Sequence, residues 1–301
     1  MNSKNLCNGC GSKKLVNISK KLNICKKCLL VSITPSKDLK KFNNSNIKYN
    51  LKYKWLEDNQ KKFKNKKQFI EQEIIKKGED IKKQNFDKIL NYTSFKKNDL
   101  ILDFGSGYGP FLNAMKKNYN VVGLEPNKDS FLFSKKLGHK VINSYLTKNL
   151  FVSKKFKLIF SRTTLTYVYD IKKMFNIFYK ILNNDGYLIF YLHQYKFSKH
   201  ISNQKYFDSM GFSEQANIFS NSSLKNLLLI NNFEIVHFNS NIDATLLIAK
   251  KSINKLKYSR QGSIKFEIFY IKYLLIKISK FFLFLFKTKK ILSKTFKKII
   301  S

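Results

Sequence analysis

The sequence is poor in arginine, proline and acidic residues. Of its 58 basic residues only Arg162 and Arg260 are arginine, and they stand against 19 acidic residues and three prolines. The net charge of +39 would suit a nucleic-acid binder, because basic faces attract phosphate. Arginine, however, is the side chain suited to paired hydrogen bonds with phosphates and base edges. Its near absence beside abundant lysine indicates a compositional bias and argues against a nucleic-acid partner.

The sequence also lacks a long apolar run. The longest uninterrupted run in its C-terminal tail is Phe281–Phe286, whereas a membrane-spanning helix needs about 20 residues. The tail over residues 263–301 places its lysines on one face of a helix. It predicts a basic amphipathic helix, which either lies peripherally on a membrane with anionic headgroups or docks on the protein's own core or on a second copy.

Cysteine is scarce, and all of it lies near the N-terminus. Cys7 and Cys10 form one Cys-x2-Cys pair, and Cys25 and Cys28 form another fourteen residues later. This spacing brings four thiolates together tetrahedrally, as a structural zinc site requires. Two disulfides or a redox dithiol are the alternatives. We identify no signal peptide and expect a cytoplasmic protein, where disulfides are uncommon.

A glycine-rich run carries the main functional signal. Leu100–Leu102 predicts a buried strand, Asp103 follows it, and three alternating glycines turn the chain toward a helix: Gly105, Gly107 and Gly109. Glycine permits positive φ angles and lets the backbone approach a ligand closely. The run therefore predicts a ligand-binding turn between a strand and a helix.

The glycine spacing and a second acid indicate which ligand this turn binds. A dinucleotide turn has the form Gly-x-Gly-x-x-Gly, and counting from Gly105 its third glycine would fall on Pro110. Proline suits the first turn of a helix but does not match that pattern. Glu125 follows a second apolar stretch, Tyr119–Leu124, at a position where an acid can accept both hydroxyls of a ribose.

Helix and strand patterns alternate after Glu125. We expect a helix over 129–137, strands near 140–143 and over 156–160, a helix over 171–182, a turn at 184–186 and a strand over 187–192. This alternation predicts a parallel sheet with right-handed crossovers and a ligand at the carboxyl ends of its strands. Helical spacing of apolar residues around 69–81 predicts a helix that packs on this sheet or covers the ligand.

Several stretches together resemble one enzyme family. The family is that of the class I S-adenosylmethionine-dependent methyltransferases. LDFGSGYGPFL resembles its motif I and VVGLEPN its acidic loop. FKLIFSRTTLTYVYD resembles its motif IV and ILNNDGYLIFYLH its last core strand. FSNSSLKNLLLINNFEIVHF resembles the helix and strand that follow them. GLEPN and the cysteine-rich N-terminus resemble bacterial methyltransferases of sugars and surface glycans that carry a four-cysteine zinc ribbon. Leu29 stands where many of these relatives have glycine.

The resemblance implies an α/β, Rossmann-like fold with a seven-stranded, mostly parallel sheet. Around it the chain would divide into an N-terminal zinc ribbon over 1–34, a helical linker or cap over 35–97, a cofactor-binding methyltransferase domain over 98–250 and a basic amphipathic tail over 251–301. The zinc would be structural, because four cysteines leave no open coordination position.

The resemblance and the strand ends together define the expected site. The residues expected to bind S-adenosylmethionine are Asp103, Gly105, Ser106, Gly107, Tyr108, Glu125, Pro126, Asn143, Ser161 and Arg162. For a general base we predict His193, with Tyr108 and His200 as alternatives. Arg162 either holds a carboxylate or phosphate of the substrate or pairs with Asp103 or Glu125.

The segment after the expected strand over 156–160 narrows the substrate class. Ser161–Thr164 lacks the Asn/Asp-Pro-Pro-Tyr/Phe motif of methyltransferases that act on amino groups of nucleic acids or glutamine. Thr166–Tyr169 stands where many relatives have a histidine. The resemblance favours methylation of carbon or oxygen in a small-molecule or glycan acceptor, such as a sugar nucleotide or a lipid-linked intermediate. The alternatives are an RNA methyltransferase with a zinc module and a non-catalytic scaffold with this fold.

Overall fold

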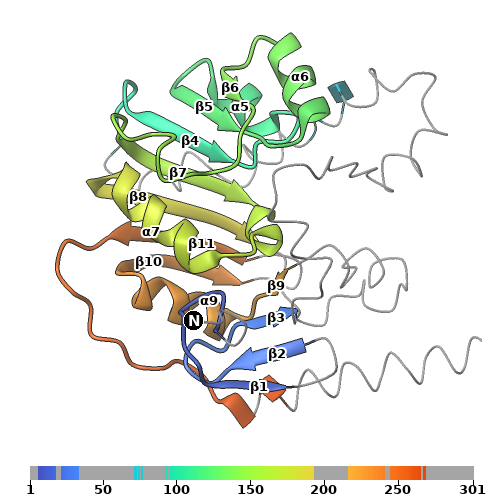
Figure 1. Ribbon diagram of the computed structural model, residues 1–301. Coiled ribbons are helices and arrows are strands. Elements are labelled where there is room, and N and C mark those ends of the chain that lie inside the picture. Colours follow the sequence, from blue (N-terminus) through green and yellow to red (C-terminus); the bar gives the residue numbers. More distant parts are fainter. Residues whose placement is uncertain are drawn as a thin grey trace, which may run out of the picture.

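A computed structural model describes residues 6–17, 22–33, 71–72, 74, 76, 92–93, 95–192, 216–240, 245–265 and 267–268. Two sheets organise these residues (Figure 1). The larger has seven strands in the order β10-β11-β8-β7-β4-β5-β6. Its strands are β4 (Leu100–Phe104), β5 (Asn120–Leu124), β6 (Val141–Ile142), β7 (Phe156–Arg162), β8 (Leu182–Leu192), β10 (Phe233–Ser240) and β11 (Thr245–Lys251).

The strand directions confirm the expected mostly parallel sheet. β4 pairs in parallel with β5 and β7, and the pairs β5–β6 and β7–β8 are parallel as well. β11 is antiparallel to both of its neighbours, β8 and β10. The strand order reverses at β4, which has β5 on one side and β7 on the other, and open α/β sheets bind ligands at such a reversal.

Helices connect the strands as the alternating pattern predicts. They are α5 (Pro110–Met115), α6 (Lys128–Lys136), α7 (Ile171–Ile181) and α9 (Asn221–Ile230), with the short 3-10 helix η2 (Thr164–Tyr167) after β7. Pro110 occupies the first turn of α5, where a missing N–H costs no hydrogen bond. Asn127 caps α6 by accepting a hydrogen bond from the backbone of Ser130.

The two faces of the large sheet bury separate apolar cores. Alternate residues of each strand point to opposite faces, so Leu102 and Phe104 join the core with α7 and α9, whereas Ile101 joins the core with α5. The α7 side chains Phe175 and Phe178 are buried in the first core. Because β4 runs parallel to β5 and β7, the loops that follow these three strands lie at one edge of the sheet.

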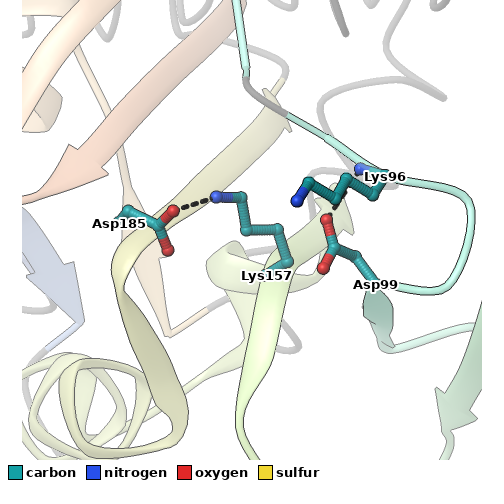
Figure 2. Close-up of polar contacts among 4 residues, drawn as sticks. All are labelled: Lys96, Asp99, Lys157 and Asp185. Carbon is teal, nitrogen blue, oxygen red and sulfur yellow. Dashed lines mark hydrogen bonds and ion pairs between the residues drawn. The ribbon is translucent and has the colours of Figure 1, made fainter.

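The start of β8 differs from the expected turn at 184–186. Leu182 already pairs with Phe156 of β7, and pairing resumes at Tyr187 with Leu158. Because Leu182, the first residue of β8, is already paired, residues 183–186 form an irregularity inside one long strand and not a turn before it. Lys157, opposite this irregularity, forms an ion pair with Asp185 (Figure 2).

The smaller sheet joins the N-terminus to a distant segment. It consists of β1 (Leu15–Asn17), β2 (Leu22–Cys25), β3 (Val31–Ile33) and β9 (Asn217–Ile218), in the order β1-β2-β3-β9. β9 pairs antiparallel with β3, placing Ser32 beside Asn217. The division into a ribbon over 1–34 and a domain over 98–250 stays a prediction. The pairing of β3 with β9 connects these two segments through backbone hydrogen bonds.

Several predictions fall wholly or partly outside the described residues. His193, His200 and the tail beyond residue 268 lie there, as does most of the helical linker, of which the helical residues Glu71, Gln72, Ile74 and Lys76 are described. Within the described part of the chain, no helix has the length and apolar character needed to span a membrane.

Candidate functional site

The loop between β4 and α5 is shaped by its glycines. Gly105, Gly107 and Gly109 all have positive φ angles, of 75°, 54° and 88°. The backbone N–H of Gly105 donates to the carbonyl of Leu124, at 2.9 Å, which ties the loop to the end of β5. A Cβ at Gly105 would lie 2.2 Å from Oγ1 of Thr164, so both the backbone angle and the space require glycine there.

Glu125 is held against this loop by backbone hydrogen bonds. Its Oε2 accepts from the N–H of Gly107 at 2.8 Å, and its Oε1 accepts from the N–H of Asn127 at 2.7 Å. Burial raises the pKa of Glu125, against the lowering effect of these two bonds. Because a carboxylate oxygen can accept two hydrogen bonds, each oxygen keeps an acceptor position for the hydroxyls of a ribose.

Asp103 lies on the neighbouring strand and is more deeply buried. Only 3% of its surface is exposed, and its Oδ2 atom has no hydrogen-bond partner. Burial, and then the charge of Glu125, raise the pKa of Asp103 well above 3.8. A buried acceptor without a partner is costly, so the site lacks a donor or a cation that a ligand would supply.

Other residues expected at the cofactor site shape the loops. Nδ2 of Asn143 donates to the carbonyls of Glu125 and Pro126, at 2.9 and 3.1 Å, and so fixes the turn after β5. The hydroxyl of Ser106 lies against Gly123, where a Cβ would come within 2.6 Å of it. The structure thus brings the glycine loop, Glu125, Pro126 and Asn143 together, with the Ser106 hydroxyl packed under the loop.

The end of β7 places Ser161 and Arg162 on opposite faces of the sheet, as strand alternation requires. The hydroxyl of Ser161 is buried without a hydrogen-bond partner. Among the described residues Arg162 has no ion-pair partner, and its charge does not contribute to the pKa shifts of Asp103 and Glu125. The alternative that Arg162 pairs with one of these acids is therefore not what the structure shows.

Two tyrosines flank the acids. The ring of Tyr108 packs edge-on against Phe133, with centroids 5.5 Å apart, and burial raises the pKa of its hydroxyl. A phenol that stays protonated donates a hydrogen bond more readily than it accepts a proton, which weakens the prediction that Tyr108 is a base. Sequence reasoning missed Tyr145, which is 50% exposed just after β6; burial, and then the nearby charge of Glu125, raise its pKa.

The four cysteines form a compact buried cluster. Their sulfur atoms all lie within 4.8 Å of one another, with 3.5 Å between Cys7 and Cys28 and 3.6 Å between Cys10 and Cys25. These separations are too long for disulfides, whose sulfurs lie about 2.05 Å apart. They approach the edge of a tetrahedron of about 3.8 Å that Zn–S bonds of about 2.3 Å would define.

Both cysteine pairs sit on the same kind of turn. The N–H groups of Gly9 and Lys27 each donate to the first sulfur of their pair, at 3.4 Å. Four residues after each first cysteine, Gly11 and Leu29 adopt positive φ angles of 72° and 63°. This conformation explains why glycine suits the position of Leu29, and the matching turns aim all four sulfurs at one point.

The cysteine cluster packs directly on the methyltransferase-like core. A Cβ at Gly9 would lie 2.5 Å from the side chain of Leu227 on α9, and Nδ2 of Asn226 donates to the carbonyl of Cys28 at 3.4 Å. The hydroxyl of Tyr258 donates to the carbonyl of Lys27. Figure 1 shows α9 lying beside the strands of the small sheet.

A cavity of about 600 Å³ lies elsewhere, where β5 begins, at the end of the sheet opposite the acids. Its lining includes four lysines, Lys97, Lys116, Lys117 and Lys140. Ligands of this sheet type bind at the carboxyl ends of the strands, so we place the functional site at Asp103 and Glu125 and not in this cavity.

The fold and site define the class of protein, and comparison with known proteins agrees. The seven-stranded sheet, with its glycine loop and acids at the strand reversal, is the fold of S-adenosylmethionine-dependent methyltransferases. A family model described as a methyltransferase domain matches residues 77–238, more than half of the sequence. The chain belongs to this methyltransferase family.

Solved structures of methyltransferases are similar to part of the chain. One from Methanosarcina mazei is 21% identical, with a TM-score of 0.43, over 55% of this chain and 97% of that one. A possible histamine N-methyltransferase from Thermotoga maritima is 19% identical, with a TM-score of 0.44, over 51% and 83%. A putative methyltransferase from Bacillus halodurans is 13% identical, with a TM-score of 0.46, over 56% and 99%. A search of curated proteins finds no match.

Proposed function

We propose that the protein transfers a methyl group from S-adenosylmethionine to a carbon or oxygen atom of a small-molecule or glycan acceptor. The observation that carries this proposal is the pair of buried acids at the ends of adjacent parallel strands, around a glycine loop that donates a hydrogen bond to one of them. The family supplies the fold, and these residues supply the binding chemistry.

Each acid has a role that its surroundings support. Glu125, already oriented by two N–H groups, accepts the two ribose hydroxyls through its remaining lone pairs. Asp103, with an unpartnered oxygen, accepts hydrogen bonds from the cationic half of the cofactor. Tyr145 provides an exposed ring beside this site, against which the adenine can stack.

The reaction is an in-line displacement at an activated methyl group. The sulfonium of the cofactor activates the methyl, so the main task of the protein is to align the nucleophile behind it. A hydroxyl or carbon-acid acceptor also needs a base, for which His193 stays the prediction. In this proposal the acceptor is a sugar nucleotide or a surface-glycan or lipid-linked intermediate, supported by the absence of an Asn/Asp-Pro-Pro motif after β7 and by the resemblance in the ribbon.

The cysteine cluster is proposed to hold a structural Zn²⁺. Without a cation, hydrogen bonds that the Cys28 thiol donates to Cys10 and Cys25, and then burial, raise its pKa. A bound divalent cation reverses this effect, because thiols that coordinate a metal are deprotonated. We further propose a cytoplasmic location, with the tail over 263–301 in peripheral contact with a membrane.

Calorimetry with S-adenosylmethionine tests the cofactor assignment. Wild-type protein should bind it, and Glu125→Gln should weaken binding on the order of 10- to 100-fold, since hydrogen bonds to a charged group are lost. Asp99→Asn is the matched control: it removes a carboxylate that caps a turn just before β4, near the opposite edge of the sheet (Figure 2). Absence of binding by wild-type protein would favour the non-catalytic scaffold.

A radiolabelled methyl donor tests the acceptor class. The full chain is incubated with the labelled cofactor and either a set of nucleotide-linked sugars or total RNA. Label in the sugar fraction supports the proposal, whereas label in RNA alone would replace it with an RNA methyltransferase.

A further inference from the structure

Arg162 and Tyr191 lie side by side at the carboxyl ends of two neighbouring strands. They are register partners across β7 and β8. Alternation along the strands puts both on the face that carries Phe160 and Ile189, which is the face covered by α5. Two polar side chains therefore meet at the edge of the sheet where open α/β folds bind ligands.

One polar atom of each side chain is buried without a partner. Nη1 of Arg162 and the hydroxyl of Tyr191 are buried and form no hydrogen bond. Burial raises the pKa of Tyr191 to about 12 even though the charge of Arg162 acts to lower it, so the phenol is a hydrogen-bond donor at neutral pH. A guanidinium nitrogen that is buried without a partner, beside an unpaired hydroxyl donor, forms a place for an anion.

The backbone holds this pair in place. Thr163 has a φ angle of 61°, which is unusual for a residue other than glycine, and its N–H donates to the carbonyl of Tyr191 at 2.7 Å. Its hydroxyl donates to the carbonyl of Arg162 at 2.7 Å, and the hydroxyl of Thr166 donates to the carbonyl of Thr163 at 2.8 Å. Strained conformations persist where the surroundings fix them, often at functional sites.

The order of the strands separates this pair from the cofactor. Glu125 follows β5, the glycine loop follows β4, and the pair lies between β7 and β8. With strands about 4.8 Å apart, the pair is roughly 12 Å along the sheet from Glu125. The sulfur of the cofactor is attached one carbon beyond the ribose ring. A cofactor with its ribose at Glu125 thus leaves the ends of β7 and β8 for the acceptor.

We propose that Arg162 and Tyr191 form an oxyanion subsite that binds a carboxylate or phosphate group of the methyl acceptor. The assignment rests on the proposed function, because only a methyl transfer gives this edge an acceptor. The guanidinium forms paired hydrogen bonds with two oxygens of the anion, and the phenol donates to one of them. The acceptor is accordingly an anion. Its charged group binds Arg162 and Tyr191, and a different atom of the acceptor is the nucleophile that attacks the methyl.

Anion binding in the presence of the cofactor product tests the subsite. Inorganic phosphate, and separately acetate, is titrated by calorimetry into the full chain saturated with S-adenosylhomocysteine, at a fixed salt concentration. Arg162→Gln should weaken binding of the preferred anion at least about tenfold, and Tyr191→Phe about threefold. Affinity for S-adenosylhomocysteine should stay within about twofold of wild type in both, because this proposal assigns Arg162 to the acceptor and not to the cofactor-binding set expected from the sequence. The control Lys154→Gln removes an exposed charge before β7 and should change neither affinity.

Three results would overturn the subsite. Equal anion affinity in wild type and Arg162→Gln would mean that surface lysines bind the anion. A tenfold loss of S-adenosylhomocysteine affinity in Arg162→Gln would assign the guanidinium to the carboxylate of the cofactor. If Arg162→Gln does not fold, the test uses Tyr191→Phe, which removes only one hydroxyl. Unchanged anion affinity in Tyr191→Phe would then contradict the proposal. If wild-type protein does not bind S-adenosylhomocysteine, the proposed function fails, and the same titration of free protein still tests the anion subsite.

Discussion

The cysteine cluster and the pair of acids are both groups of buried ionisable side chains, but they differ in what completes them. The four sulfurs lie within 4.8 Å of one another and converge on one point inside the core. Asp103 and Glu125 instead end neighbouring strands, and Asp103 keeps an unpartnered oxygen. A single ion would complete the first group from within, whereas the second needs a ligand from outside. In the proposed function the first group serves stability and the second serves binding.

Breaking the cysteine cluster should have the largest effect on stability. Cys28→Ser removes one ligand and should abolish stoichiometric zinc, measured by metal analysis, and lower the thermal unfolding midpoint sharply. Structural zinc sites contribute on the order of 10 kcal/mol, comparable with the whole stability of a domain. Ser12→Ala, at a half-buried position just after the first cysteine turn, is the control. A midpoint within a few degrees of wild type would show that the cluster carries little stability.

Changing the glycine loop should affect binding more than stability. Gly105→Ala adds a Cβ that meets Thr164 at 2.2 Å, and it places alanine at a positive φ angle. Gly107→Ala causes the same kind of backbone strain without a steric clash, because nothing lies within 4 Å of its Cβ. We expect calorimetry to show no detectable cofactor binding for the first variant and a loss on the order of tenfold for the second. Equal losses of cofactor affinity in the two variants would mean that backbone strain alone, and not the clash with Thr164, causes the loss.

Neutralising Asp103 should move stability and binding in opposite directions. The pKa of Asp103 is raised by burial, so the folded protein holds its proton where the unfolded chain has lost it. The stability of ligand-free protein therefore falls as pH rises from 3.8 through the raised pKa, and Asp103→Asn removes this loss. Denaturant unfolding at neutral pH should show a more stable free protein, and calorimetry a weaker affinity for the cofactor. A less stable Asp103→Asn protein would contradict this account.

The ion pair at the start of β8 should give the smallest effect. Asp185 has a side chain that is 58% exposed, and a hydrogen bond from Lys157 lowers its pKa. Its stabilisation is present above its ordinary pKa of 3.8 and is lost as pH falls through the lowered value. Asp185→Asn should cost up to about 1 kcal/mol at neutral pH, measured by denaturant unfolding. The same cost in a background of Lys157→Met would show that the pair contributes nothing.

Local patterns in the sequence predicted the five parallel strands of the large sheet, whereas no range was predicted for β11. The apolar strand before Asp103 and the helix starting at Pro110 needed only periodicity and turn residues to be recognised. The early start of β8 was not predicted, because the pairing of Leu182 with Phe156 is a long-range contact with no local signal.

Site geometry was predictable only in part. Glu125 follows from its position after a strand, but its bond to Gly107 depends on how two loops meet. Tyr145 was missed for the same reason: an aromatic residue after a two-residue strand carries no pattern of its own. The convergence of the cysteines was predictable because their spacing encodes the turns.

The pairing of β3 with β9 also has a consequence for how the protein is made. The strands β1 to β3 are translated before the large sheet, yet the last strand of the small sheet contains Asn217, which is translated after most of the large sheet. During synthesis the edge of β3 therefore stays unpaired until β9 has been translated. A metal ion bound early by the four cysteines would keep the waiting segment folded during synthesis.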